Sequence, residues 1–167
     1  MPDLGFTPPV RPVVAPHAVR RPGAAAGAAA ALSLAAAWVH LAYTASHWQD
    51  WWAYGAFFLA MGVFQGLCAP AIVRRPRSAP VALGVIAGNL AIVAMYVLSR
   101  TAGIPLGPHA GVVEEAGAVD LGVTAAEVAI VACALALLRP RPRRLLVGAL
   151  LVAGSALWLL RLTGRLP

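Results

Sequence analysis

Charged residues are scarce in this chain of 167 residues, and lysine is absent. Only 11% of the residues are charged, whereas 60% are hydrophobic and the mean hydropathy is +0.78. A water-soluble domain of this size needs a far more charged surface, so the composition excludes an ordinary soluble globular protein. It favours a protein that is surrounded mostly by lipid.

Cysteine is also rare. Cys68 and Cys133 each lie inside an apolar run, and no second cysteine stands at CxxC or metal-ligand spacing. Thiolate metal sites and CxxC redox chemistry are therefore excluded, and both thiols are expected to pack as small hydrophobic groups. The chain also lacks a Ser/His/Asp arrangement, HExxH, a Gly-rich phosphate loop and a spaced pair of catalytic carboxylates. An enzyme that acts on lipid or isoprenoid substrates is the least favoured class of function.

All thirteen basic residues are arginine, and ten of them fall in three clusters between long apolar runs. The clusters are Arg11, Arg20 and Arg21; Arg74, Arg75 and Arg77; and Arg139, Arg141, Arg143 and Arg144. Acidic residues occupy the opposite gaps. Because short arginine-rich loops of membrane proteins stay in the cytoplasm, this alternation predicts a polytopic membrane protein with a cytoplasmic N-terminus. Lipid headgroups, not nucleic acid, are the expected partners of the arginines.

Five apolar segments are long enough to cross a hydrocarbon core of about 30 Å as helices. They cover approximately residues 24–46, 53–73, 81–99, 121–138 and 145–160. The predicted fold is therefore an all-α integral membrane bundle of five transmembrane helices with its C-terminus outside. We expect residues 24–138 to form a four-helix bundle with an ordered outer loop, 100–120, and a more lipid-exposed fifth helix within 145–162.

Residues 1–23 contain six prolines and three arginines. Proline removes helical hydrogen bonds and little apolar surface is available for burial, so this segment is expected to be a disordered cytoplasmic tail. The Arg20-Arg21 pair before an alanine-rich run leaves a cleaved signal peptide as the alternative. The apolar run continues past Trp38, which favours an uncleaved first span.

Small and aromatic residues predict where the helices meet each other and the membrane surface. Glycines four residues apart allow close helix packing inside the monomer, with dimerisation as the alternative; the pairs are Gly23/Gly27, Gly62/Gly66 and Gly84/Gly88. Aromatic residues near the short outer loop 47–52 are expected to form a belt at the outer interface; they are Trp48, Trp51, Trp52 and Tyr54, joined by Trp158.

Polar residues inside the apolar segments are costly in lipid, so each is expected to face protein or water. Helical spacing places them on one face of each of the first four segments. These faces carry His40, Tyr43, Thr44 and His47; Tyr54, Met61, Gln65 and Cys68; Asn89, Tyr96 and Arg100; and Asp120, Thr124 and Glu127. Since His40 and Glu127 lie about 9 Å inside the outer boundary, the sequence predicts a polar cavity that opens outward.

Two cation chemistries suit such a cavity. The candidate metal ligands are His40, His47 and His109. For a transition metal or haem, either His40 or His47 would combine with a second ligand, which could be His109, Glu114, Glu115 or Glu127. His40 and His47 themselves are about 10.5 Å apart along a helix, too far to hold one small ion together. A histidine on an apolar helix is also commonly a buried hydrogen-bonding residue.

The second chemistry is proton handling through Glu127. Burial disfavours its charged form, whereas a nearby His40 or Arg100 favours it. The alternative is a purely structural pairing of Glu127 with Arg100, Tyr96 or Asn89. The candidate ligand- or cofactor-binding residues are Gln65, Asn89, Tyr96, Arg100 and Glu127.

The outer loop 100–120 is rich in turn-forming residues, including Gly103, Pro105, Gly107 and Pro108. Such residues predict tight turns, so the loop is expected to be ordered over the mouth of the bundle. As a lid it would hold His109 above His40 and His47. A solvent-exposed connector is the other interpretation.

Two stretches resemble a group of small polytopic membrane proteins of high-GC bacteria with four to five helices. One stretch is 40–55, which includes His47 and Trp48, and the other is 99–108, with acidic residues and Glu127 downstream. Together with the spans between them they cover approximately residues 35–130. The resemblance implies a helical architecture in the bacterial cytoplasmic (inner) membrane and no particular activity.

The function that we predict from the sequence is the binding or transfer of a small cation, either a transition metal or a proton, at an outward-facing site. A non-catalytic accessory subunit of a larger membrane complex is the alternative. Expected partners are the lipid bilayer and, for the alternative, that complex.

Overall fold

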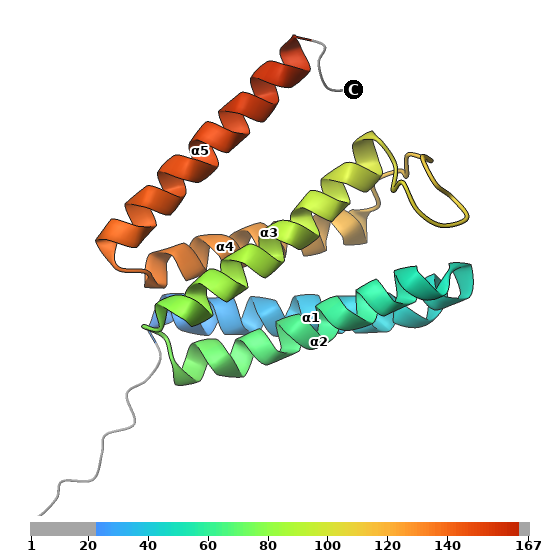
Figure 1. Ribbon diagram of the computed structural model, residues 1–167. Helices are drawn as coiled ribbons and strands as arrows, with labels where there is room; N and C mark the ends of the chain where they lie inside the picture. Colours follow the sequence, from blue (N-terminus) through green and yellow to red (C-terminus); the bar gives the residue numbers. More distant parts are fainter. Residues whose placement is uncertain (1–22, 164–167) are drawn as a thin grey trace, which may run out of the picture.

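A computed structural model describes residues 23–163 of the chain, which form five helices and no strand (Figure 1). The helices are α1 (Ala24–Asp50), α2 (Trp52–Arg74), α3 (Ala79–Thr101), α4 (Ala118–Leu137) and α5 (Pro140–Leu162). The all-helical prediction is confirmed. The predicted tail lies almost entirely outside the described residues.

Each helix is long and apolar enough to cross a membrane. The shortest has 20 residues and the longest 27, which correspond to about 30 and 40 Å at 1.5 Å per residue. Pro80 and Pro140 stand in the first turns of α3 and α5, where a missing backbone N–H costs nothing. In the first turn of α4, the Asp120 carboxylate accepts a hydrogen bond from the Gly117 N–H at 3.0 Å.

The outer turn between α1 and α2 is much tighter than the predicted loop 47–52. Helix α1 continues through His47 to Asp50, and only Trp51 separates it from α2. Trp51 has an extended backbone, and its N–H donates to the His47 carbonyl at 3.0 Å. His40 therefore lies ten positions, or about 15 Å, before the end of α1, whereas the predicted first segment ended six positions after it.

Helices α1 to α4 pack together, whereas α5 stands apart. Helix α1 contacts both α2 and α4, and α3 contacts α4 and, less extensively, α2. Figure 1 shows α5 turning away from the other four after the short link at Leu138 and Arg139. None of the spanning segment of α5 is buried, in agreement with the expectation of an exposed fifth helix.

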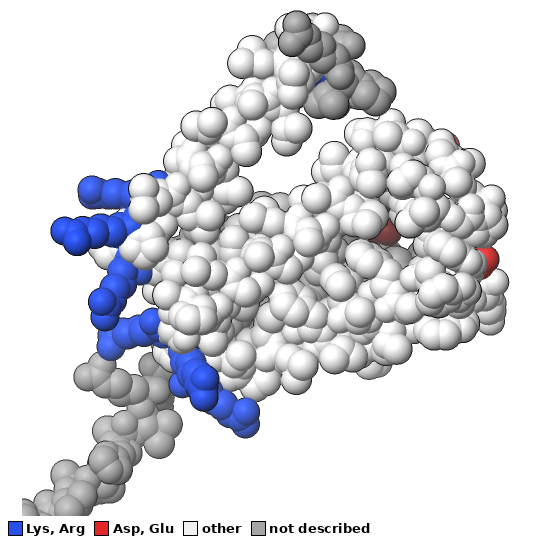
Figure 2. Space-filling model, in the orientation of Figure 1, with Lys and Arg blue, Asp and Glu red and all other residues white. Residues whose placement is uncertain are grey.

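The apolar core fills the half of the bundle that adjoins the arginine clusters. It is made of small and branched side chains, which include Ala26, Ala29, Ile72, Ala82, Val85, Ile86, Ile130 and Ala134. Alanines dominate because they let the helix backbones approach closely. Figure 2 shows a group of arginine side chains at this end of the molecule and acidic side chains at the other.

Two of the six paired glycines contribute close packing. A Cβ atom at Gly62 would lie 2.7 Å from the Leu41 side chain on α1, and one at Gly88 would lie 2.1 Å from the Phe64 ring on α2. Gly23, Gly27, Gly66 and Gly84 have open space at that position. The packing prediction is therefore wrong for the Gly23/Gly27 pair. In each of the other two pairs it is correct for one glycine, Gly62 or Gly88.

Candidate functional site

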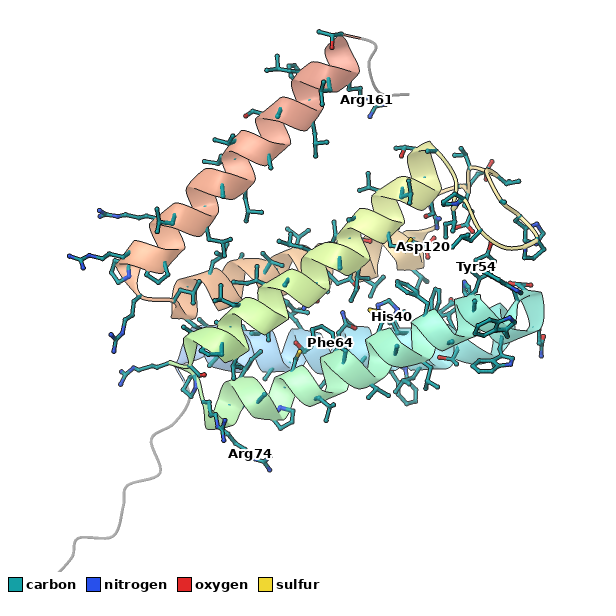
Figure 3. The ribbon with its side chains drawn as sticks, viewed as in Figure 1. His40, Tyr54, Phe64, Arg74, Asp120 and Arg161 are labelled. Atoms are coloured by element: carbon teal, nitrogen blue, oxygen red, sulfur yellow. The ribbon has the colours of Figure 1, made fainter. Side chains whose placement is uncertain are left out.

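A buried histidine and a buried glutamate meet at the centre of the bundle. His40 on α1 and Glu127 on α4 lie 87 positions apart in the chain, and His40 Nε2 is 3.0 Å from Glu127 Oε1. His40 is 5% exposed and Glu127 is 1% exposed. In Figure 3 the His40 side chain points between the helices, into the interior of the bundle. The two residues that the sequence placed on inward faces therefore contact each other directly.

Two amides continue this network toward α2 and α3. Gln65 Nε2 donates to Glu127 Oε1 at 3.3 Å and to Asn89 Oδ1 at 3.1 Å, and Asn89 Nδ2 donates to the Val85 carbonyl at 2.8 Å. Both amides are completely buried. One hydrogen-bonded cluster thus joins all four helices, directly above the apolar core.

A cavity of about 330 Å³ lies between this cluster and the end of the bundle where α1 joins α2 and α3 joins α4. Six of the eight residues predicted as ligands or binding groups line it, namely His40, His47, Tyr96, Arg100, His109 and Glu127. Gln65 and Asn89 lie beneath its floor. Asp120 and Thr124, on the same face of α4 as Glu127, also belong to the wall. The predicted polar stripes of α1, α3 and α4 therefore surround one space.

The three candidate metal ligands do not form a metal centre. The Phe58 ring stacks on His47 with a centroid distance of 3.7 Å and meets His40 edge-on at 5.5 Å. His47 Nδ1 donates to the Tyr43 carbonyl at 2.9 Å. Across residues 23–163, no three His, Cys, Asp or Glu side chains gather closely enough to hold a metal ion. The transition-metal and haem predictions thus gain no support from the geometry.

Arg100 is engaged at the mouth of the cavity, away from Glu127. Its guanidinium donates to Asp120 Oδ2 at 2.8 Å, to Ser99 Oγ at 2.8 Å and to Glu114, and it lies over the Tyr96 ring at 5.0 Å. The structural pairing of Glu127 with Arg100 that the sequence left open is not formed. Glu127 has instead the neutral amide of Gln65 and the titratable ring of His40 as its partners.

The loop between α3 and α4 closes over the mouth. Gly103, Gly107 and Gly111 have positive φ, between 75° and 86°, a backbone conformation that favours glycine. The Tyr54 hydroxyl donates to the Leu106 carbonyl at 2.8 Å, and the Glu114 N–H donates to the Ser99 carbonyl at 3.1 Å. The loop is fixed to α2 and α3 in the position expected of a lid.

The aromatic residues of the outer turn divide between two environments. Trp48 and Trp52 are exposed, as expected of an interfacial belt, and so is Trp158. Trp51 and Tyr54 meet edge-on at 5.0 Å and line the cavity, and a Cβ on Gly107 would collide with both. The tight turn and the lid hold Trp51 and Tyr54 inward, and the interfacial position of the aromatic belt stays a prediction.

Sequence reasoning missed Phe58 and the roles of Asp120 and Glu114. Phe58 stands seven residues before Gln65, so helical spacing already placed both on one face of α2. The contacts of Arg100 with Glu114 and Asp120 were harder to predict from the sequence, because the fold of the lid is what brings Glu114 to Arg100. Spacing along one helix cannot report such a contact.

The hydrogen bond between His40 and Glu127 can run in either direction. Glu127 Oε1 accepts from Gln65 Nε2, and the same oxygen can accept from a protonated His40 Nε2 or, as a carboxyl O–H, donate to an unprotonated one. His40 Nδ1 is buried and has no partner among the described residues.

Fold and site together define a small all-helical protein with the features of a multi-pass membrane protein, built around a His–Glu pair beneath a lidded cavity. Comparisons with protein-family models, curated proteins and solved structures find no match to the chain. The resemblance to small membrane proteins of high-GC bacteria stays a prediction.

Proposed function

We propose that this chain is a multi-pass protein of the bacterial cytoplasmic membrane that takes up and releases a proton at Glu127, on the outer side. The His40–Glu127 contact of 3.0 Å beneath the cavity is the observation that carries this proposal. A carboxyl group in an apolar interior strongly favours its neutral form, and a hydrogen-bonding imidazole opposes that preference. Because these two effects oppose each other, such a carboxyl group can accept and release a proton.

The proposed orientation rests on charge. One arginine cluster stands at the end of α2 and in the link to α3; it consists of Arg74, Arg75 and Arg77. The other stands in the link between α4 and α5 and at the start of α5; it consists of Arg139, Arg141, Arg143 and Arg144. All are exposed. The positive-inside rule assigns this end to the cytoplasm and the cavity to the opposite side. A proton would then reach Glu127 from outside, past the lid.

Infrared spectroscopy of the purified full-length protein in a lipid nanodisc tests the proposal. A pH-induced difference spectrum should show the C=O stretch of a protonated carboxyl group in an apolar site, and Glu127→Gln should remove it. Glu115→Gln is the matched control, because Glu115 is exposed on the loop and does not line the cavity. An unchanged spectrum in Glu127→Gln, or an imidazolium band in place of the carboxyl band, contradicts the assignment.

A non-catalytic accessory subunit remains the second candidate, and α5 is the observation that favours it. This helix is apolar yet unburied along its whole span, so one side is available for a larger membrane complex. A stoichiometric partner after purification in mild detergent supports this function. A monodisperse monomer counts against it.

A further inference from the structure

The cavity is acidic, although the chain as a whole is basic. Four carboxylates line it, from Asp50, Glu114, Asp120 and Glu127, against the single guanidinium of Arg100. The whole chain, by contrast, carries a formal net charge of +7. An anionic ligand would meet repulsion here, whereas a cation would be attracted.

Local pairing leaves two of these carboxyl groups, those of Asp50 and Glu127, without a guanidinium partner among the described residues. Arg100 contacts both Glu114 and Asp120, so its charge is already shared between two carboxylates. Glu127 has no guanidinium or ammonium partner, and Gln65 is neutral. A negative charge on Glu127 therefore needs either a proton on the His40–Glu127 pair or a cation in the cavity above it.

Aromatic rings form much of the wall. Tyr43, Trp51, Tyr54, Phe57, Phe58 and Tyr96 all line the cavity. The faces of such rings attract organic cations, and several rings around one space are the usual receptor for a substituted ammonium group. The volume of about 330 Å³ falls within the range of small-molecule sites, about 300–1,000 Å³, and is far larger than a metal ion requires.

The buried imidazole gives a second, independent indication of a ligand. His40 lines the cavity and is 5% exposed, yet its Nδ1 has no partner among the described residues. A buried polar atom of this kind usually has a hydrogen-bond partner. A ligand with a hydroxyl or N–H group beside its charged centre would supply one.

We propose that the cavity binds a small organic cation, a substituted ammonium ion, whose charge replaces the proton of Glu127. This inference rests on the proposed proton function of the same site. When the cation enters, the O–H bond of the Glu127 carboxyl group breaks and the proton leaves for water through the mouth. The net charge of the buried site is then the same before and after binding.

The pH dependence of binding has several possible contributors. Besides Glu127, the cavity holds His40, His47 and Asp50 from α1, Arg100 from α3 and Asp120 from α4, together with His109 and Glu114 from the lid. Tyr43, Tyr54 and Tyr96 add three phenol groups to the lining. Glu127 is the carboxyl group among these that is completely enclosed by the bundle, so substitution of this residue separates its contribution from the others.

Calorimetric titration of the full-length protein in a neutral detergent tests the proposal. The probe is benzyltrimethylammonium, and its uncharged isostere neopentylbenzene is the charge control, with titrations into empty micelles subtracted. We expect binding of the ammonium ion, release of about one proton, and affinity that rises by up to about tenfold per pH unit where Glu127 is protonated. Repeating the titration in buffers of different ionisation enthalpy gives the number of protons released on binding.

Two substitutions keep the test decisive. Glu127→Gln should weaken ammonium binding by about tenfold or more and abolish proton release, whereas Glu115→Gln should match the wild type. If Glu127→Gln does not fold, Trp51→Leu is the substitute. It should weaken the binding of the ammonium ion more than the binding of neopentylbenzene. Equal affinity for both probes, or ammonium binding that Glu127→Gln leaves unchanged, overturns the proposal.

Failure of this inference and failure of the proposed function give different results. If the infrared carboxyl signal titrates but benzyltrimethylammonium does not bind, the proton function stands and the ligand inference is wrong. If the ammonium ion binds through Glu127 without proton release and no carboxyl signal titrates, the cation site stands and the proton function is wrong.

Discussion

Replacing His40 by leucine should lower the free energy of unfolding by about 1–3 kcal/mol, the usual cost of leaving a buried polar group without one of its hydrogen-bond partners. The substitution leaves the Glu127 carboxyl group in the bundle with Gln65 as its one side-chain hydrogen-bond partner. The double variant His40→Leu/Glu127→Leu should recover most of that loss, because two apolar side chains of similar size replace both polar groups. Reversible unfolding in mixed micelles measures all three free energies.

The matched control is His109→Leu. His109 lies on the exposed lid, so its substitution should change the free energy of unfolding by less than about 0.5 kcal/mol. A cost below about 1 kcal/mol for His40→Leu, or a double variant less stable than either single variant, would mean that the pair does not act as a unit.

Gly55→Ala should destabilise the protein by about 1–3 kcal/mol, the range observed for overpacked sites. A Cβ atom at Gly55 would lie 2.7 Å from the Cα of Trp48 and 2.6 Å from two atoms of its side chain. Backbone atoms cannot move aside as a flexible side chain can, so α1 and α2 must separate at their tight outer turn. Thermal unfolding followed by circular dichroism measures the effect.

Gly66→Ala is the control for the same helix. A Cβ at Gly66 meets nothing within 4 Å, so the change should be neutral or stabilising by up to about 1 kcal/mol through its helix propensity. If both variants behaved alike, the close approach of α1 and α2 at Gly55 would be wrong.

Much of this architecture can be predicted from the sequence, because a helix that spans a lipid bilayer needs a long apolar run. Apolar runs of helical length and alternating arginine clusters predicted the five helices, and inward-facing stripes correctly grouped His40 with Glu127. The position at which α1 ends was less predictable. Interfacial residues such as His47 tolerate both helix and loop, so the end of α1 could not be located from hydropathy.

Contacts between helices could not be predicted in detail. His40 and His47 share a face of α1, yet the Phe58 ring from α2 lies against both. Whether such a ring intervenes depends on how two helices cross, and a spacing pattern contains no crossing angle. The same limit explains the paired glycines, of which Gly62 and Gly88 meet a neighbour and Gly66 and Gly84 do not.

The alanine-rich core below the polar cluster makes the site one-sided. Among the described residues, the segments of α1 to α4 nearest the arginine clusters bury mainly apolar side chains, such as Ala26, Ile72 and Ala82, and no Asp, Glu, His or Arg. Protons cross such a close-packed layer only where polar side chains or water provide a route. Whatever reaches Glu127 in this conformation must leave as it came, so passage through the bundle would require α1 to α4 to move apart at that end.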